Sequence, residues 1–313
     1  MAKLILGSRG SALALAQVQI VKEALRRIHS ELEIEVKIIT TSGDRRQDVR
    51  AGEGSAAGLK GLFTKEIQDA LLNGSIDAAV HSLKDLPGIT PDALGLAAVL
   101  PRADTSDLLI SGTHSALSSL PAGARVGTSS VRRRRQIGWL REGLEIVELR
   151  GNVPTRLQKL GSLPLDGIVL ARAGLERLGY SITDGRLDCD AGSFFATALD
   201  ILPAIGQGAI GIETRREDSA TASIVSAIDH GPAHTCIRVE RELLRLLDGD
   251  CRLPVGARAT LDAAGALHAD AIVFQDGMAQ PARAHATGPA VDPEALAKRL
   301  FNQLSYLGSS LLL

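Results

Sequence analysis

Residues 3–28, KLILGSRGSALALAQVQIVKEALRRI, carry the pattern that decides the fold, a strand followed by a helix. Lys3–Gly7 is a short apolar run with the length of a buried strand. A helix is predicted over Ser11–Ile28, with Ser11 as its N-cap. The apolar residues of this segment recur at helical spacing and form one face to bury: Leu13, Ala16, Val18, Val21 and Leu25.

The same alternation continues through the first two-thirds of the chain. A strand–helix–strand rhythm implies parallel sheets with helices on both faces, so the expected class is α/β. The further predicted elements are a helix at Thr64–Leu72 and strands at Glu33–Thr40, Ile76–His81, Ala124–Gly127, Glu145–Leu149 and Gly167–Ala171.

The last third has a different pattern. A charged helix is predicted over Thr235–Leu247 and a final helix over Pro293–Leu307. Between them, Arg258–Leu261 and Leu267–Phe274 have the alternation of antiparallel strands. This is an α+β arrangement, and we expect a domain boundary near Asp229–Pro232.

The composition narrows the class of protein. A length of 313 residues allows about two or three domains. The net charge of −1 provides no global attraction to nucleic acid, and 3% aromatic residues leave few platforms for stacking bases. The apolar runs are shorter than the roughly 18 residues of a membrane span, and the run near the N-terminus is too short for a signal peptide.

The cysteines are Cys189, Cys236 and Cys251, an odd number without the spacing of a zinc site or a disulfide framework. A reducing cytoplasm is the expected compartment. Cys251 lies in a Gly- and Pro-bounded turn, GDCRLPVG, beside Arg252. A neighbouring cation favours the thiolate, which suits a nucleophile or a covalent anchor, whereas an ordinary free cysteine is the alternative.

Polar and charged side chains follow nearly every predicted strand. In open α/β sheets, ligands bind beyond the carboxyl ends of the strands, and arginine suits carboxylate or phosphate groups. We therefore expect a cleft that binds a polyanion, although each arginine taken alone is compatible with a solvated helix face. The arginines concerned are Arg9, Arg132, Arg133, Arg150, Arg156 and Arg177.

Four consecutive arginines begin one predicted helix. They cannot all face one ligand, because successive helical residues point about 100° apart. Arg132 and Arg133, nearest the helix N-terminus, are expected to contact the ligand, and Arg134 and Arg135 to lie at the surface or between domains. Nucleic-acid binding is the alternative for this run, and the composition argues against it.

Asp85 lies close to Lys84 and His81 after a predicted strand. One interpretation is a loop carboxylate paired with the neighbouring lysine. The other is a carboxylate held in the cleft, where it stabilises a cation or transfers a proton.

Several long motifs occur in order along the chain. They are GLFTKE at 61–66, HSLKDLP at 81–87, VGTSSVRR at 126–133, LRGNVPTR at 149–156, AGLERLG at 173–179, GQGA at 206–209 and the Cys251 loop. Together these motifs resemble the hydroxymethylbilane synthase family, also called porphobilinogen deaminase, over nearly the whole chain.

The resemblance implies three domains. Two are doubly wound α/β units similar to periplasmic binding proteins, formed by residues 1–101 with 203–226 and by residues 102–202. The cleft lies between them. Residues 230–313 form a smaller α+β domain that carries Cys251.

The resemblance also implies a transferase of tetrapyrrole biosynthesis, towards haem or sirohaem-type products. Such enzymes join four porphobilinogen molecules head to tail with loss of ammonia and release linear hydroxymethylbilane by hydrolysis. The implied cofactor is a dipyrromethane linked to Cys251 through a thioether. A cytoplasmic monomer is expected, without a metal, nucleic-acid or membrane partner.

The site residues are implied by the same motifs. Asp85 matches the catalytic aspartate, and the acetate and propionate groups of each pyrrole suit the arginines. Cofactor contacts match Lys84, Asp85, Thr128, Ser129, Arg132, Arg133, Arg150, Gly151 and Cys251. Substrate contacts match Arg9, Ser11, Phe63, Arg150, Arg156, Arg177 and Gln207.

Three positions depart from the family pattern: Leu59, Asp250 and Arg252, the last in place of a glutamine. Leu59 replaces a glycine in the loop Gly52–Gly61, which we expect to be mobile, and Asp250 places a carboxylate beside the thiol of Cys251. That carboxylate should raise the thiol pKa, against the effect of Arg252. A non-catalytic anion-binding protein on the same scaffold is the competing hypothesis, because a fold alone does not establish a function.

Overall fold

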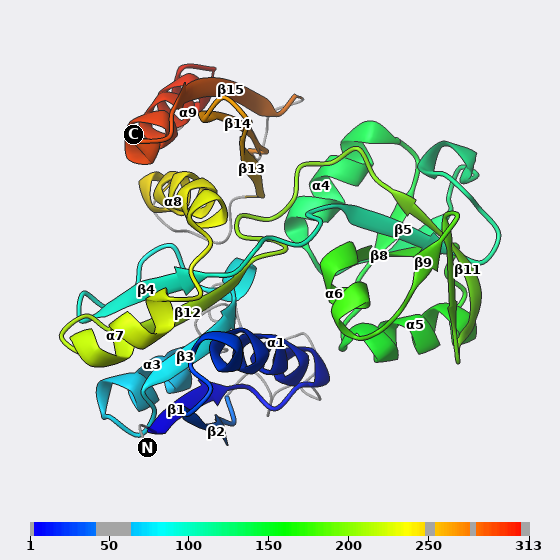
Figure 1. Ribbon diagram of the computed structural model, residues 1–313. Coiled ribbons are helices and arrows are strands. Elements are labelled where there is room, and N and C mark those ends of the chain that lie inside the picture. Colours follow the sequence, from blue (N-terminus) through cyan, green and yellow to red (C-terminus); the bar gives the residue numbers. More distant parts are fainter. Residues whose placement is uncertain (1–2, 42–63, 248–253, 276–279, 308–313) are drawn as a thin grey trace.

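The structure is a computed structural model that describes residues 3–41, 64–247, 254–275 and 280–307. Figure 1 shows three lobes, each built around its own sheet. The sheets have five, seven and three strands. Among the described residues, no helix combines the length and the apolar character needed to cross a membrane.

The five-stranded sheet has the order β2-β1-β3-β12-β4. Strands β1 (Lys3–Ser8), β2 (Glu33–Ile38) and β3 (Ala78–Ser82) pair in parallel. Strand β12 (Ile210–Arg215) lies between β3 and β4 (Leu94–Val99) and is antiparallel to both. The chain therefore returns to this sheet after it has built the second one.

Helices cover both faces of the five-stranded sheet. Helices α1 (Ala12–Ile28) and α7 (Ser219–Ser226) pack on one face, and α3 (Lys65–Leu72) packs on the other. Ser11 caps α1 as predicted, because its hydroxyl accepts a hydrogen bond from the Ala14 backbone at 3.3 Å. Only three residues separate the end of β1 at Ser8 from the start of α1 at Ala12.

The seven-stranded sheet has the order β7-β6-β8-β5-β11-β10-β9. Strands β6, β7 and β8 pair in parallel, and the other pairs are antiparallel. The bounds are β5 Asp107–Ser111, β6 Arg125–Gly127, β7 Glu145–Val147, β8 Gly167–Ala171, β9 Ile182–Thr183, β10 Arg186–Cys189 and β11 Gly192–Ala198, with a short 3₁₀ helix, η4, at Leu117–Ser119.

Helices also cover both faces of this second sheet. Helix α4 (Val131–Leu140) packs on one face, and α5 (Val153–Ser162) and α6 (Arg172–Arg177) pack on the other. The predicted α/β class with doubly wound sheets is confirmed. The predicted parallel pairing is present only in part of each sheet, because β4, β5, β11 and β12 run antiparallel to their neighbours and were not recognised as strands.

The three-stranded sheet is an antiparallel meander of β13 (Val255–Leu261), β14 (Ala266–Val273) and β15 (Ala282–Pro289). Helices α8 (Gly231–Leu246) and α9 (Pro293–Leu307) pack on its inner face, as the predicted α+β pattern requires.

Helix α8 begins four residues before the start expected at Thr235. Pro232 lies in the first turn, and the His230 side chain accepts a hydrogen bond from the Ala233 backbone at 3.2 Å. Proline is favoured in a first turn because its missing N–H would have no helical partner there.

Candidate active site

An open hollow lies at the carboxyl ends of β1 and β3. Arg9 and Ser11, which follow β1, line it together with Ser82 and Asp85. Asp85 ends a short 3₁₀ helix, η3 (Leu83–Asp85), that directly follows β3. The predicted meeting of these two strand ends is therefore present, and it brings two cleft candidates, Arg9 and Asp85, to one site.

A buried polar cluster holds the segment that carries Asp85 in place. His81 Nε2 lies 3.1 Å from Glu213 Oε2, and Gln68 Nε2 donates to Glu213 Oε1 at 3.1 Å. Ser82 Oγ accepts from Gln17 Nε2 at 2.6 Å, which ties the segment to α1. These contacts fix the backbone just before Asp85, while the Asp85 side chain remains partly accessible.

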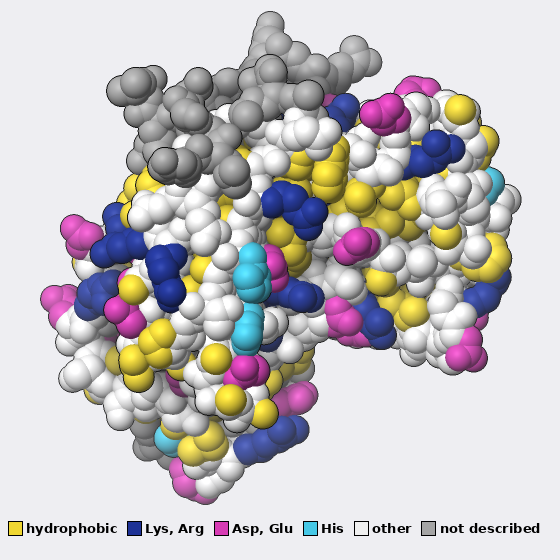
Figure 2. All heavy atoms as spheres, turned by 90° about the horizontal axis from the view of Figure 1, so that it is seen from above, with side chains coloured by type: hydrophobic (Ala, Val, Ile, Leu, Met, Phe, Trp, Pro, Cys, Tyr) yellow, Lys and Arg dark blue, Asp and Glu magenta, His cyan; other side chains and the backbone are white. Residues whose placement is uncertain are grey.

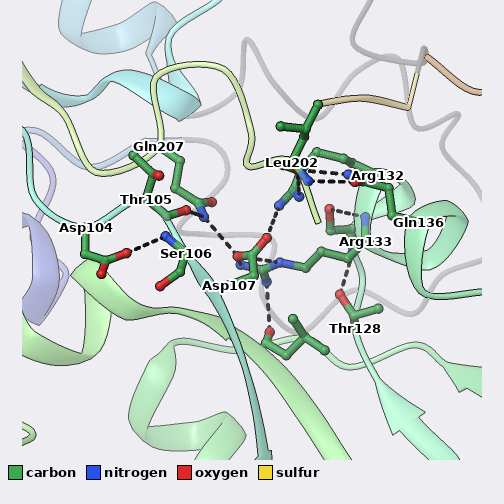
Figure 3. Close-up of polar contacts among 12 residues, drawn as sticks. Asp104, Thr105, Ser106, Asp107, Thr128, Arg132, Arg133, Gln136, Leu202 and Gln207 are labelled. Carbon is green, nitrogen blue, oxygen red and sulfur yellow. Dashed lines mark hydrogen bonds and ion pairs between the residues drawn. The ribbon is translucent and has the colours of Figure 1, made fainter. Parts of the chain in front are cut away.

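A second cluster gathers around Asp107, a fully buried carboxylate at the start of β5 (Figure 3). Arg132 Nη2 donates to Oδ2 at 2.7 Å, and Arg133 Nη2 donates to Oδ1 at 2.6 Å. Gln207 Nε2 donates to Oδ1 at 2.9 Å from the segment that returns to the first sheet. Sequence reasoning missed Asp107, because its burial and its partners Arg132 and Gln207 depend on contacts that are distant in the sequence.

The two arginines of this cluster are bound by the protein itself. Arg132 Nη1 donates to the Leu202 carbonyl at 2.6 Å, and Arg133 Nη1 donates to the Val169 carbonyl at 2.8 Å. Arg132 Nε is buried and has no hydrogen-bond partner among the described residues. Arg134 and Arg135 are exposed, as the 100° spacing predicts.

The electrostatics of the cluster follow from burial. Burial alone would raise the pKa of Asp107, yet Arg133 and Arg132 together hold that pKa well below its usual range. Burial lowers the pKa of Lys84 to about 8, with Asp85 opposing the shift and Arg133 adding to it. Lys84 of the first lobe therefore lies within electrostatic reach of the second lobe's arginines.

Two further arginines lie partly buried in the same second lobe. Arg156 Nε donates to the Gly151 carbonyl at 2.7 Å, and Arg177 Nη2 donates to the Gly208 carbonyl at 2.6 Å. Burial lowers the pKa of each guanidinium to about 10, and Arg133 adds to the shift at Arg156. Gly208 has φ 83°, and a Cβ there would lie 2.5 Å from the Ala103 carbonyl oxygen, so the position requires glycine.

The N-terminus of α4 contains the predicted hydroxyl residues. Thr128 Oγ1 accepts from the Ser130 backbone at 3.2 Å, and Ser129 Oγ donates to the Leu149 carbonyl at 2.5 Å. Arg150 is half exposed and donates to Glu148 at 2.5 Å. Its side chain is thus engaged by a neighbouring carboxylate, outside the Asp107 cluster.

Several predicted features lie outside the described residues: Cys251 with Asp250, Phe63, and the loop Gly52–Gly61 with Leu59. The other two cysteines are free thiols. Burial, with Glu240 nearby, raises the pKa of Cys236 to about 11, which makes this thiol unreactive.

Comparisons with known proteins identify the family of the chain. The family profile "Porphobilinogen deaminase, dipyromethane cofactor binding domain" matches residues 4–223, and the profile "Porphobilinogen deaminase, C-terminal domain" matches residues 234–305. The chain belongs to the porphobilinogen deaminase family. The resemblance predicted from the sequence motifs is confirmed.

Individual relatives cover almost the whole chain. The porphobilinogen deaminase of Moorella thermoacetica is 41% identical over 310 residues, which is 99% of this chain and 95% of the relative. The porphobilinogen deaminase of Staphylococcus aureus (strain MRSA252) is 40% identical over 312 residues, 99% of this chain and 96% of the relative. Among solved structures, the methionine binding protein MetQ is 12% identical with a TM-score of 0.42, covering 72% of this chain and 89% of MetQ.

The described residues of this porphobilinogen deaminase family member fit an anionic cofactor. Lys84, Arg156 and Arg177 have lowered pKa values because burial is not fully offset by carboxylates. A ligand with several carboxylates would supply the missing negative charge. The buried Nε of Arg132 is a further donor without a protein acceptor among the described residues.

Proposed function

We propose that this chain is a hydroxymethylbilane synthase. It joins four porphobilinogen molecules head to tail with loss of one ammonia each, and then releases linear hydroxymethylbilane by hydrolysis, in tetrapyrrole biosynthesis. The observation that carries the proposal is the position of Asp85. It is a partly accessible carboxylate beside a lysine of lowered pKa, in a hollow of a chain that belongs to this family.

Binding of the substrate and the growing chain is assigned to cations and hydrogen-bond donors. Each pyrrole carries an acetate and a propionate, and one hydrogen bond to a charged group contributes about 1.5–3 kcal/mol. Contacts to the substrate are assigned to Arg9, Ser11, Phe63, Arg150, Arg156, Arg177 and Gln207. Contacts to the cofactor are assigned to Lys84, Asp85, Thr128, Ser129, Arg132, Arg133, Arg150 and Gly151.

The proposed anchor of the cofactor is the Cys251 thiol. A dipyrromethane linked there through a thioether would supply the pyrrole carbon to which the first substrate is joined. In this proposal, a cleft between the first two domains holds the carboxylates, with Arg9 supplied by the first domain and Arg150, Arg156 and Arg177 by the second.

Asp85 is the proposed catalytic residue. When the C–N bond of the substrate breaks and ammonia leaves, positive charge develops on the pyrrole nitrogen. A fixed carboxylate within reach of that nitrogen stabilises the charge. The same carboxylate assists removal of the proton that the attacked pyrrole carbon loses when the new C–C bond forms.

The domain division is part of the proposal. Residues 1–101 with 203–226 form the first domain, residues 102–202 the second and residues 230–313 the third. This division agrees with the three sheets and with the place of β12 beside β3. A cytoplasmic monomer is the proposed working state, and sedimentation of the purified protein tests the monomer.

The deciding experiment is the intact mass of the purified, denatured protein beside that of a Cys251→Ser variant. We expect an excess matching two linked pyrrole units in the first protein and none in the variant. Ammonia release from added porphobilinogen is measured on the same preparations. No adduct and no ammonia release would favour a non-catalytic anion-binding protein.

A further inference from the structure

We propose that His268 and His285, on the outer face of the three-stranded sheet, form a two-histidine binding site for a divalent transition-metal ion such as Ni²⁺ or Zn²⁺. This site is separate from the candidate active site. Metal binding there does not depend on the proposed reaction.

The register of two strands brings the histidines together. His268 on β14 is paired with Thr287 on β15, and Asp270 is paired with His285. The two histidines are therefore diagonal neighbours on one face, at a separation that long side chains span. Figure 2 shows histidine side chains in a short row on the surface of the molecule that faces the viewer.

A carboxylate holds one nitrogen of each ring. His268 Nε2 lies 2.9 Å from Asp262 Oδ2, and His285 Nδ1 lies 2.9 Å from Asp270 Oδ1. An ionised carboxylate only accepts hydrogen bonds, so the nitrogen that faces it carries the hydrogen. In each neutral imidazole, the lone pair is then on the other nitrogen, as in histidines that bind metals.

Both of these other nitrogens face the same point. His268 Nδ1 lies 3.3 Å from the Thr287 hydroxyl oxygen, and His285 Nε2 lies 3.5 Å from that oxygen. A threonine hydroxyl has a single hydrogen and can donate it to one nitrogen only. Two imidazole lone pairs therefore converge on one hydroxyl that can satisfy only one of them, and a metal ion that displaces this hydroxyl would accept both.

The chemistry of the ligands selects the kind of ion. Imidazole suits zinc, nickel and copper, whereas carboxylates and carbonyls suit magnesium and calcium. Across the described ranges, no group of three or more His, Cys, Asp or Glu residues has a metal-binding arrangement. The proposed site thus uses two protein ligands, with water completing the coordination. The side chains are 39% and 60% exposed, which leaves room for that water.

The test is calorimetric titration of the untagged, full-length protein with Ni²⁺ at neutral pH. We expect one equivalent of bound Ni²⁺, and its loss in His268→Ala and in His285→Ala. The control is His114→Ala in the second lobe, which should bind as the unaltered protein does. Failure of the unaltered protein to bind, or equal binding by all the variants, would overturn the site.

A second pair of variants tests the supporting carboxylate. Losing the partner of a metal-binding histidine lowers metal affinity by roughly 10–100-fold. We expect that reduction in Asp270→Asn and no change in Asp188→Asn, which alters an exposed carboxylate on β10. Circular dichroism confirms that the variants are folded. Unchanged Ni²⁺ affinity in Asp270→Asn would mean that the histidine–aspartate contacts are surface ion pairs only.

Discussion

Arg102 and Glu240 form a bidentate ion pair, with Nη1–Oε1 at 2.6 Å and Nη2–Oε2 at 3.0 Å. Glu240 is buried and also accepts from the backbone of Gly206 and of Ala259, each at 2.8 Å. One carboxylate of α8 therefore binds the segment after β4, the returning segment and β13. It joins parts of the chain that belong to different lobes.

Removal of Glu240 should destabilise the protein strongly. Glu240→Ala leaves Arg102 without its partner in a buried setting, so we expect the free energy of unfolding to fall by about 3–5 kcal/mol in urea denaturation. The control is Glu294→Ala, because Glu294 forms a bidentate ion pair with Arg238 on the exposed surface. That change should cost about 0–1 kcal/mol. Equal losses in the two variants would contradict the role of Glu240.

Removal of the Asp107 charge should be equally severe. Asp107→Asn leaves two buried arginines uncompensated, and we expect a loss of about 3–5 kcal/mol. Because the arginines lower its folded pKa, the contribution of Asp107 is present in full above about pH 4 and is lost as the pH falls through the folded pKa. Denaturation at pH 7 measures the loss, with Glu145→Gln as the exposed control. A stable Asp107→Asn protein would disprove this account.

Asp85 should be needed for turnover and not for folding. Removal of an electrostatic group of this kind typically lowers the rate by about 10²–10³-fold. We therefore expect Asp85→Ala to lose at least that much kcat in product formation, while its circular dichroism and its covalently bound cofactor are retained. Asp92→Ala alters an exposed carboxylate of the same lobe and should keep normal kcat. Near-normal turnover of Asp85→Ala would refute its assignment.

The buried charge of Lys84 should lower the free energy of unfolding. Its folded pKa is about 8, whereas an unfolded lysine has a pKa of about 10.4. Below pH 8 both states are protonated and the buried charge destabilises the fold in full. Between pH 8 and about 10.4 only the unfolded state keeps the proton, so this destabilisation fades as pH rises.

We therefore expect Lys84→Met, in the Cys251→Ser background that lacks the anchor, to raise the free energy of unfolding at pH 7. The gain should be on the order of 1–3 kcal/mol and should vanish near pH 10. Urea denaturation at both pH values measures it, with the exposed Lys65→Met as control. A gain that is independent of pH would show that packing, and not charge, is responsible.

Local signals in the sequence were sufficient for several elements. The predicted strand Gly167–Ala171 and the predicted helix Pro293–Leu307 coincide with β8 and α9. Ser11 was recognised as a cap because its side chain and the helix it begins are neighbours in the chain. The meeting of Arg9 and Asp85 followed from one rule, since parallel strands place their carboxyl ends at the same edge.

The sequence by itself thus determined the α/β class, the family motifs and the strand ends that carry the site. Only the tertiary structure decided what those residues contact. Asp107, Arg132 and Gln207 meet although their hydrogen bonds span 25 and 100 positions along the chain. Likewise, β12 enters the first sheet by pairing with strands far from it in sequence. Such pairings depend on burial and hydrogen-bond satisfaction across the folded chain, and no local pattern encodes them.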